Sequence, residues 1–155
     1  MSWLFDCLKC IKKPIILDLS TWDTSNVVTM RSMFQKCKSL IDVNLSHFNT
    51  SQVTRMDLMF SECTHLKSID LSSFNTRSVV CMQSMFQNCE SLTNIDISHF
   101  RLDDLSIATN MFNNCYNLVE CKIPDFSKLD IYYLYNMFNQ CPESIIPEWY
   151  KEKMK

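Results

Sequence analysis

The sequence predicts an α/β fold: a solenoid of five 26-residue strand–helix repeats, with a parallel sheet on one face and helices on the other. Three observations predict it: a Met-Phe pair recurs at a constant interval, a cysteine follows each pair, and the apolar spacing changes within each repeat. The pairs are at 33–34, 59–60, 85–86, 111–112 and 137–138, and the cysteines are at 37, 63, 89, 115 and 141. Five copies in register are very hard to obtain by chance.

The first part of each repeat has the pattern of a short strand. In the third repeat Ile69, Leu71 and Phe74 are separated by polar residues. Near alternation of apolar and polar side chains is typical of a half-buried strand. Asn75 and Thr76 follow, and such residues favour a turn.

The second part of each repeat has the spacing of a helix. Its apolar residues recur at intervals of three or four positions, which is one stripe of an amphipathic helix. In the third repeat they are Val79, Met82, Met85, Phe86 and Cys89. One unit cannot bury this stripe alone, so stacked neighbours are expected to cover it.

The two ends are expected to cap the array. Residues 1–14 predict an N-terminal capping helix that Pro14 ends, because the apolar stripe continues backwards into this segment. Residues 15–144 form the predicted solenoid. Residues 145–155 are expected to be a C-terminal cap or tail, with Ile145, Ile146 and Trp149 folded over the last repeat.

The sequence of the repeat resembles that of a known family. Residues 17–27 and the run Met33-Phe34, Cys37 and Leu40 resemble the BspA-like leucine-rich-repeat family, over about residues 15–144. The resemblance implies a right-handed, leucine-rich-repeat-like solenoid used for adhesion or interaction, and it brings no catalytic residues. Such repeats occur in bacterial surface proteins, protists and large DNA viruses. The chain lacks the glycine that the family often has before the repeat cysteine.

Composition excludes several classes of site. The chain of 155 residues has no glycine, which excludes glycine-rich phosphate loops in their usual form. A net charge of −2 gives no field that would attract nucleic acid. The N-terminus lacks the order of a signal peptide, so we expect an intracellular, reducing compartment. The repeat cysteines lie on the buried stripe of the expected helices, and neighbouring helices about 8–10 Å apart are too distant for disulfides, so we expect reduced, buried packing groups.

The expected sheet face carries the best candidate for a partner site. One strand position holds Asp18, Asn44, Asp70 and Asp96, and His47 and His99 lie beside it. A solvated face is the default interpretation of such a row. Because solenoids present broad sheets to their ligands, the row is also the best candidate for a protein partner site. The histidines are too dispersed for a catalytic cluster.

Two further sets of residues are candidates for contact. Tyr132, Tyr133 and Tyr135 stand where earlier repeats have polar residues, and they serve either as a secondary contact or as packing under the C-terminal cap. Cys7 and Cys10 are candidate acylation sites on the N-terminal helix. No metal or cofactor site is expected.

The sequence therefore predicts a non-catalytic protein-interaction or scaffold module, such as a structural component of a virion or another larger assembly. A large DNA virus or a protist would suit this prediction as a source. The alternative is a membrane-associated adaptor or adhesion-type protein, tethered through an amphipathic, acylated N-terminal helix. Partner identity and oligomeric state stay open.

Overall fold

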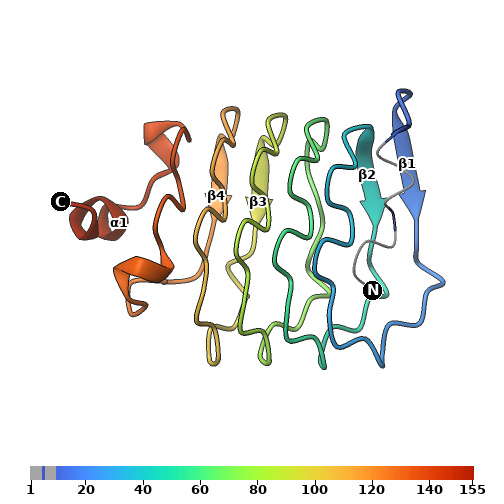
Figure 1. Ribbon diagram of the computed structural model, residues 1–155, viewed down its shortest axis with the longest axis horizontal. Coiled ribbons are helices and arrows are strands. Elements are labelled where there is room, and N and C mark those ends of the chain that lie inside the picture. The colour runs from blue at the N-terminus through green and yellow to red at the C-terminus, as the bar shows by residue number, and fades with distance from the viewer. Residues whose placement is uncertain (1–4, 6–9) are drawn as a thin grey trace.

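The computed structural model describes Phe5 and residues 10–155. Its elements are β1 (Ile15–Asp18), β2 (Leu40–Asn44), β3 (Asn94–Asp96), β4 (Glu120–Lys122), the 3-10 helices η2 (Ile131–Tyr133) and η3 (Glu143–Ile145), and α1 (Glu148–Lys153). We number repeats 1 to 5 over residues 15–40, 41–66, 67–92, 93–118 and 119–144. Successive repeats lie side by side along the long axis, and α1 lies beyond the last of them (Figure 1).

Parallel hydrogen-bonded ladders join the repeats on two faces. On the first, which we call the strand face, β1 pairs with β2 and β3 pairs with β4, with partners such as Leu17 and Val43 that occupy the same position of successive repeats. On the second, the bridge face, isolated parallel bridges connect Thr29, Arg55, Cys81 and Ile107. The repeat in the sequence is therefore also the interval of backbone pairing.

The segment that the sequence predicts to be helical is a run of turns. The N–H of Cys37 donates to the Phe34 carbonyl at 3.1 Å, but the N–H of Phe34 donates to Met59 in the next repeat at 2.9 Å. Phe60, Phe86 and Phe112 donate in the same way to Met85, Met111 and Met137. A helix needs these donors for its own carbonyls. Within residues 15–130, all of which the structure describes, no helix forms.

Left-handed backbone at two positions of every repeat produces these turns. The first set is Ser32, Leu58, Ser84, Asn110 and Asn136, and the second set is Lys36, Glu62, Asn88, Asn114 and Gln140. Their φ angles lie between 54° and 64°. The second set directly precedes the repeat cysteines, where BspA-like repeats often have glycine. Glycine adopts this conformation without steric cost, whereas other residues do so at a penalty.

The core is organised as columns of identical side chains. The rings of Phe34, Phe60, Phe86, Phe112 and Phe138 stack with successive centroid distances of 5.2, 5.7, 5.5 and 5.6 Å. Phe5 extends the column at one end, at 4.9 Å from Phe34. Tyr150 of α1 meets Phe138 edge-on at 5.1 Å at the other end. Residues 1–4 and 6–9 of the predicted capping helix lie outside the described residues.

A column of buried thiols runs beside the phenylalanines. The thiols of Cys63, Cys89 and Cys115 donate to the carbonyls of Phe34, Phe60 and Phe86 at 3.1, 3.2 and 3.2 Å. These three cysteines are reduced and fully buried, as the sequence predicts, and Cys37 is buried as well. Cys141 is only half-buried. Each thiol thus links its own repeat to the preceding one.

Buried threonines join neighbouring repeats at the turn that follows each strand position. The Thr50 hydroxyl donates to the Asn75 carbonyl at 2.9 Å and accepts the Asn75 N–H at 2.8 Å. The same pair of hydrogen bonds links Thr24 to Asn49 and Thr76 to Arg101. The equivalent residue of repeat 4 is Leu102, which has no hydroxyl. The threonine column therefore ends where the repeat sequence begins to diverge.

Candidate interaction surface

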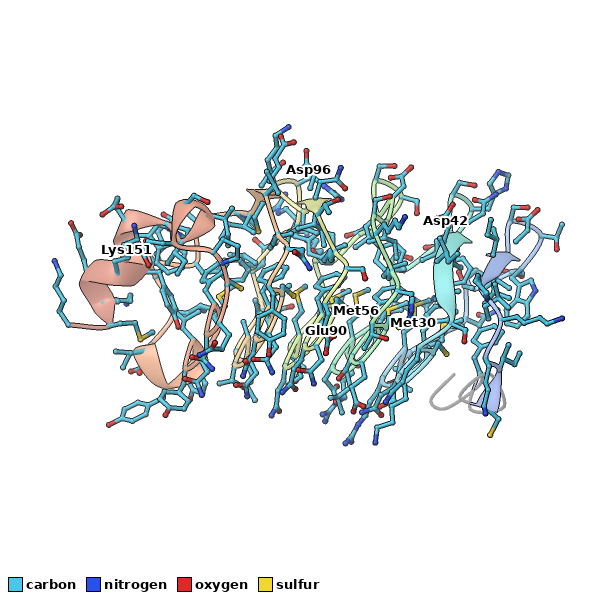
Figure 2. The ribbon with its side chains drawn as sticks, turned by 90° about the horizontal axis from the view of Figure 1, so that it is seen from above. Met30, Asp42, Met56, Glu90, Asp96 and Lys151 are labelled. Carbon is cyan, nitrogen blue, oxygen red and sulfur yellow. The ribbon has the colours of Figure 1, made fainter. Side chains whose placement is uncertain are left out.

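The predicted row of polar residues lies outward on the strand face. Asp18, Asn44, Asp70 and Asp96 are all exposed, while their neighbours along the chain are buried or half-buried against the core. Figure 2 shows Asp96 on the outside of the molecule, with Met30 and Met56 between the two faces. The structure therefore brings four of the sequence-predicted site residues into one row.

Each member of the row is held by the residue two positions later. The side-chain oxygens of Asp18, Asn44, Asp70 and Asp96 accept the N–H groups of Ser20, Ser46, Ser72 and Ser98 at 3.0, 3.1, 2.9 and 3.0 Å. These contacts orient the side chains locally.

Those hydrogen bonds also keep the carboxyl groups charged. The hydroxyl and the N–H of Ser20 lower the pKa of Asp18, and those of Ser98 do the same for the pKa of Asp96. The N–H and then the hydroxyl of Ser72 lower the pKa of Asp70. A hydrogen bond to the ionised form favours that form. The row is thus negative at neutral pH.

Lys122 ends the row with the opposite charge. Its ammonium group lies 3.0 Å from a Glu120 oxygen and 4.0 Å from an Asp96 oxygen. Both contacts are exposed, and exposed ion pairs contribute little to stability. Lys122 therefore offsets only part of the negative charge around Asp96.

The two histidines of the predicted site have different environments. His99 Nε2 lies 3.2 Å from the Leu71 carbonyl, and since that oxygen can only accept, the histidine donates. The His99 ring also meets Phe100 edge-on at 5.1 Å. His47 is exposed and lowers the pKa of Asp18 by its charge, after the larger contribution of Ser20. Both histidines are exposed, and His99 is tied to repeat 3 through its hydrogen bond to Leu71.

A hollow of about 350 Å³ opens in the strand face between repeats 3 and 5. Its lining consists of Ser68, Ile69, Asp70, Asn94, Ile95, Asp96, Glu120 and Lys122. A neighbouring hollow of about 420 Å³ shares Ile69, Asp70 and Asp96 with it and continues towards His99. The candidate site is therefore concave around two of the predicted carboxylates.

The three tyrosines lie apart from this hollow, in and beside η2. Tyr132, Tyr133 and Tyr135 are 81%, 44% and 62% exposed. Their backbone continues the bridge face, because the carbonyls of Tyr133 and Tyr135 accept N–H groups from repeat 4. Their exposure favours the contact role over packing under the C-terminal cap, where Tyr150 lies edge-on to Phe138. A contact role for the tyrosines stays a prediction.

The candidate acylation site is only half described. Cys10 is exposed, and Cys7 lies outside the described residues. In the described part of the chain, no three His, Cys, Asp or Glu side chains are grouped as metal ligands. The same residues include no helix long and apolar enough to cross a membrane.

A buried carboxylate on the bridge face, paired with two half-exposed arginines, was not expected from the sequence. The Asp57 carboxylate, only 4% exposed, accepts the Nε–H of Arg55 at 2.8 Å, and its other oxygen lies 3.0 Å from Arg31 Nε. The hydrogen bond to Asp57 raises the pKa of Arg55. Arg31 and Asp57 occupy the same position of successive repeats, so a comparison of repeat columns could have found this link between repeats 1 and 2.

The stacked units and the polar, mostly acidic row define a repeat protein with one regular, charged face. The chain belongs to the family described as Mycoplasma protein of unknown function, DUF285, which matches residues 1–126. That span includes the first four repeats and the start of the fifth. Comparison with curated proteins and with solved structures finds no match.

Proposed function

We propose that this protein is a non-catalytic interaction module of the BspA-like leucine-rich-repeat type, which binds a protein partner through its strand face. The observation that carries the proposal is the row of oriented polar side chains at one position of repeats 1 to 4, three of which are ionised carboxylates. Charged groups at fixed spacing favour a partner of complementary pattern.

The rigid attachment of the row to the core supports a scaffold role. Ile69 and Leu71 flank Asp70 and are buried, so the backbone beneath the carboxylate is fixed by packing. A surface that is already ordered loses little conformational entropy when it binds. A place within a larger assembly, such as a virion, is the finer form of the proposal.

A charge-matched pull-down tests the proposal. The row variant carries Asp18→Lys, Asp70→Lys and Asp96→Lys, and the control carries Glu90→Lys, Asp104→Lys and Glu152→Lys. All six residues are exposed, and both variants change the net charge equally. We expect mass spectrometry to find partners with wild type and control that the row variant loses. Equal recovery with both variants would remove the strand face from the proposal.

A second candidate, membrane tethering, rests on the exposed Cys10. Metabolic labelling with a palmitate analogue should mark the wild type, and a Cys7→Ser, Cys10→Ser variant should be unlabelled. Absence of label in the wild type would leave the tether without support.

A further inference from the structure

The segments that lead from the bridge face into the strand face form one edge of the molecule. They consist of residues 36–41, 62–67, 88–93 and 114–119, with residues 10–14 before them at the N-terminal end. Figure 1 shows them side by side along the upper side of the molecule, where the strands begin. We call this surface the loop edge.

Contacts between successive segments keep the loop edge ordered. The Ser39 hydroxyl donates to the Ile11 carbonyl. The later contacts join Lys38 to His65, Thr64 to Ser91, and Thr93 to Val119, at 2.6, 3.2 and 2.7 Å. Each segment is thus tied to the next, so the side chains of the loop edge keep their relative positions.

The loop edge is positively charged, although the chain as a whole is not. Its exposed lysines are Lys12, Lys13, Lys36, Lys38 and Lys67. Its carboxylates are those of Glu62 and Glu90, and Glu62 lies 3.6 Å from Lys36. The other four ammonium groups have no ion-pair partner among Phe5 and residues 10–155. Three positive charges therefore stay uncompensated on this edge of a chain whose net charge is −2.

The same edge carries exposed apolar side chains at its far end. Tyr116 occupies the position of Lys38 three repeats later, and Val119 occupies the position of Lys67 two repeats later. Equivalent positions of stacked repeats have the same outward direction. Tyr116 and Val119 are 48% and 76% exposed. One ordered surface thus presents ammonium groups and apolar groups in the same direction.

An anionic lipid bilayer matches both properties. Its surface attracts nearby lysines, at a gain in binding of about fivefold for each. Aromatic and aliphatic side chains enter the layer between headgroups and acyl chains. A polyanion in solution would match the lysines but would leave the apolar groups in water.

We infer that the loop edge binds the surface of an anionic lipid bilayer, with its lysines against the headgroups and with Tyr116 and Val119 in the interfacial layer. The acidic strand face is repelled by such a surface and therefore turns away from it. The inference goes beyond the proposed function, because the loop edge and the strand face are different surfaces with different ligands.

The exposed Cys10 lies at the N-terminal end of the loop edge, two positions before Lys12. A single acyl chain holds a protein at a bilayer only weakly, whereas one chain together with a basic patch holds it stably. The lysines would thus complete the tether that acylation of Cys10 begins.

Cosedimentation of the full, unacylated chain with vesicles tests the inference. The vesicles contain phosphatidylcholine with about 30% phosphatidylserine, or phosphatidylcholine alone. The edge variant carries Lys12→Gln, Lys38→Gln and Lys67→Gln, and the charge-matched control carries Arg77→Gln, Lys128→Gln and Lys155→Gln. All six residues are exposed.

We expect wild type and control to bind the anionic vesicles, and the edge variant to bind them at least tenfold more weakly. Binding should fall steeply when NaCl rises from about 0.1 M to about 0.5 M, and it should be absent on phosphatidylcholine alone. Equal binding of the edge variant and the control, or no binding of the wild type, would overturn the inference.

A gain of binding excludes misfolding as the cause of a loss. Glu90 is exposed on the loop edge, at the same position as Lys38 two repeats earlier. Glu90→Lys should strengthen binding to the anionic vesicles about tenfold. Asp104→Lys makes the same change of charge at an exposed residue outside the loop edge and should have little effect. Equal gains in the two variants would contradict a localised surface.

A third pair of variants distinguishes a bilayer from other polyanions. Tyr116→Ser with Val119→Ser should weaken vesicle binding about fivefold, because the interfacial contact is lost. Val28→Ser with Tyr132→Ser removes similar exposed side chains from the bridge face and should leave binding unchanged. Binding to polyglutamate or duplex DNA that exceeds binding to the vesicles at equal charge concentration would overturn the lipid assignment.

The outcomes separate the inference from the proposed function. If the vesicles fail to bind while the Asp18→Lys, Asp70→Lys and Asp96→Lys variant still loses partners in the pull-down, the loop-edge inference alone is wrong. If the vesicles bind through the lysines while the pull-down finds no difference, the inference stands and the strand face is not an interaction surface.

Discussion

Non-glycine residues in left-handed backbone set the local conformation of every repeat. Gln140 is the clearest case for a test, because its φ is 62° and its side chain is exposed. Gln140→Gly should stabilise the protein by about 1 kcal/mol, since glycine removes the steric penalty of this conformation. Urea unfolding measures the change.

The control for that substitution is the same replacement at an ordinary position. Gln52 is exposed and is not among the residues with positive φ. Gln52→Gly should destabilise the protein by about 0.5 to 1 kcal/mol through the entropy of the unfolded chain. A loss of stability in Gln140→Gly would contradict the assignment of strain.

The buried Thr50 hydroxyl satisfies two backbone groups of Asn75 at once. Thr50→Val keeps the shape but leaves both groups unpaired, so we expect a loss of about 2 kcal/mol in the free energy of unfolding. Thr50→Ser keeps the hydroxyl and should lose less than Thr50→Val. Chemical denaturation of the three proteins decides the order, and a valine variant more stable than the serine variant would refute the hydrogen-bond account.

The thiol column predicts a fall in stability at alkaline pH. Burial raises the pKa of Cys63, Cys89 and Cys115 well above its ordinary value. These thiols keep their protons in the folded protein, whereas in the unfolded chain they ionise above about pH 8.5. The stability they support is therefore complete below that pH and falls by about 1.4 kcal/mol per thiol and pH unit above it.

Urea unfolding between pH 8 and pH 10.5 measures this slope. Cys89→Ala removes one of the thiols, so its stability should fall less steeply with pH than that of wild type, although the variant is less stable at pH 8. Identical slopes would show that the thiols do not titrate as their burial implies.

The apolar spacing in the second half of each repeat, from which a helix is predicted, occurs in a run of turns as well. Both place residues three or four apart on one side of the chain. The difference lies in backbone donors such as the N–H of Phe34, which bonds to the next repeat. The spacing of apolar residues carries no information on which carbonyl such an N–H group bonds to. The missing glycine before Cys37, Cys63 and the later repeat cysteines was the signal that marked the left-handed position.

The repeats of the whole molecule are interchangeable in register, which a deletion can test. Removing residues 53–78 takes out one full period and joins Gln52 to Val79, the equivalent of Val53. We expect this chain to fold cooperatively, because each repeat contacts its neighbours alone. Removing residues 53–77 shifts every later column by one position and should abolish the cooperative transition. Circular dichroism during thermal unfolding compares the two.

The row of the candidate site was predictable from the sequence, but the hollow beside it was not. The outward positions of Asp18, Asn44, Asp70 and Asp96 follow from the period and the alternation of the strand residues. The hollow between repeats 3 and 5 depends on how neighbouring repeats are placed in space, and the spacing of apolar residues in the sequence carries no information on that placement. The right-handed, leucine-rich-repeat-like class of the array stays a prediction.

The constant interval between paired backbone groups, which equals one repeat, has a genetic consequence. Unequal crossing-over between similar stretches of the gene adds or removes whole repeat units. Each product keeps its reading frame, its phenylalanine and cysteine columns, and the interface that every unit already has with the next. A lineage can therefore lengthen or shorten the strand face by recombination alone, without evolving a new contact.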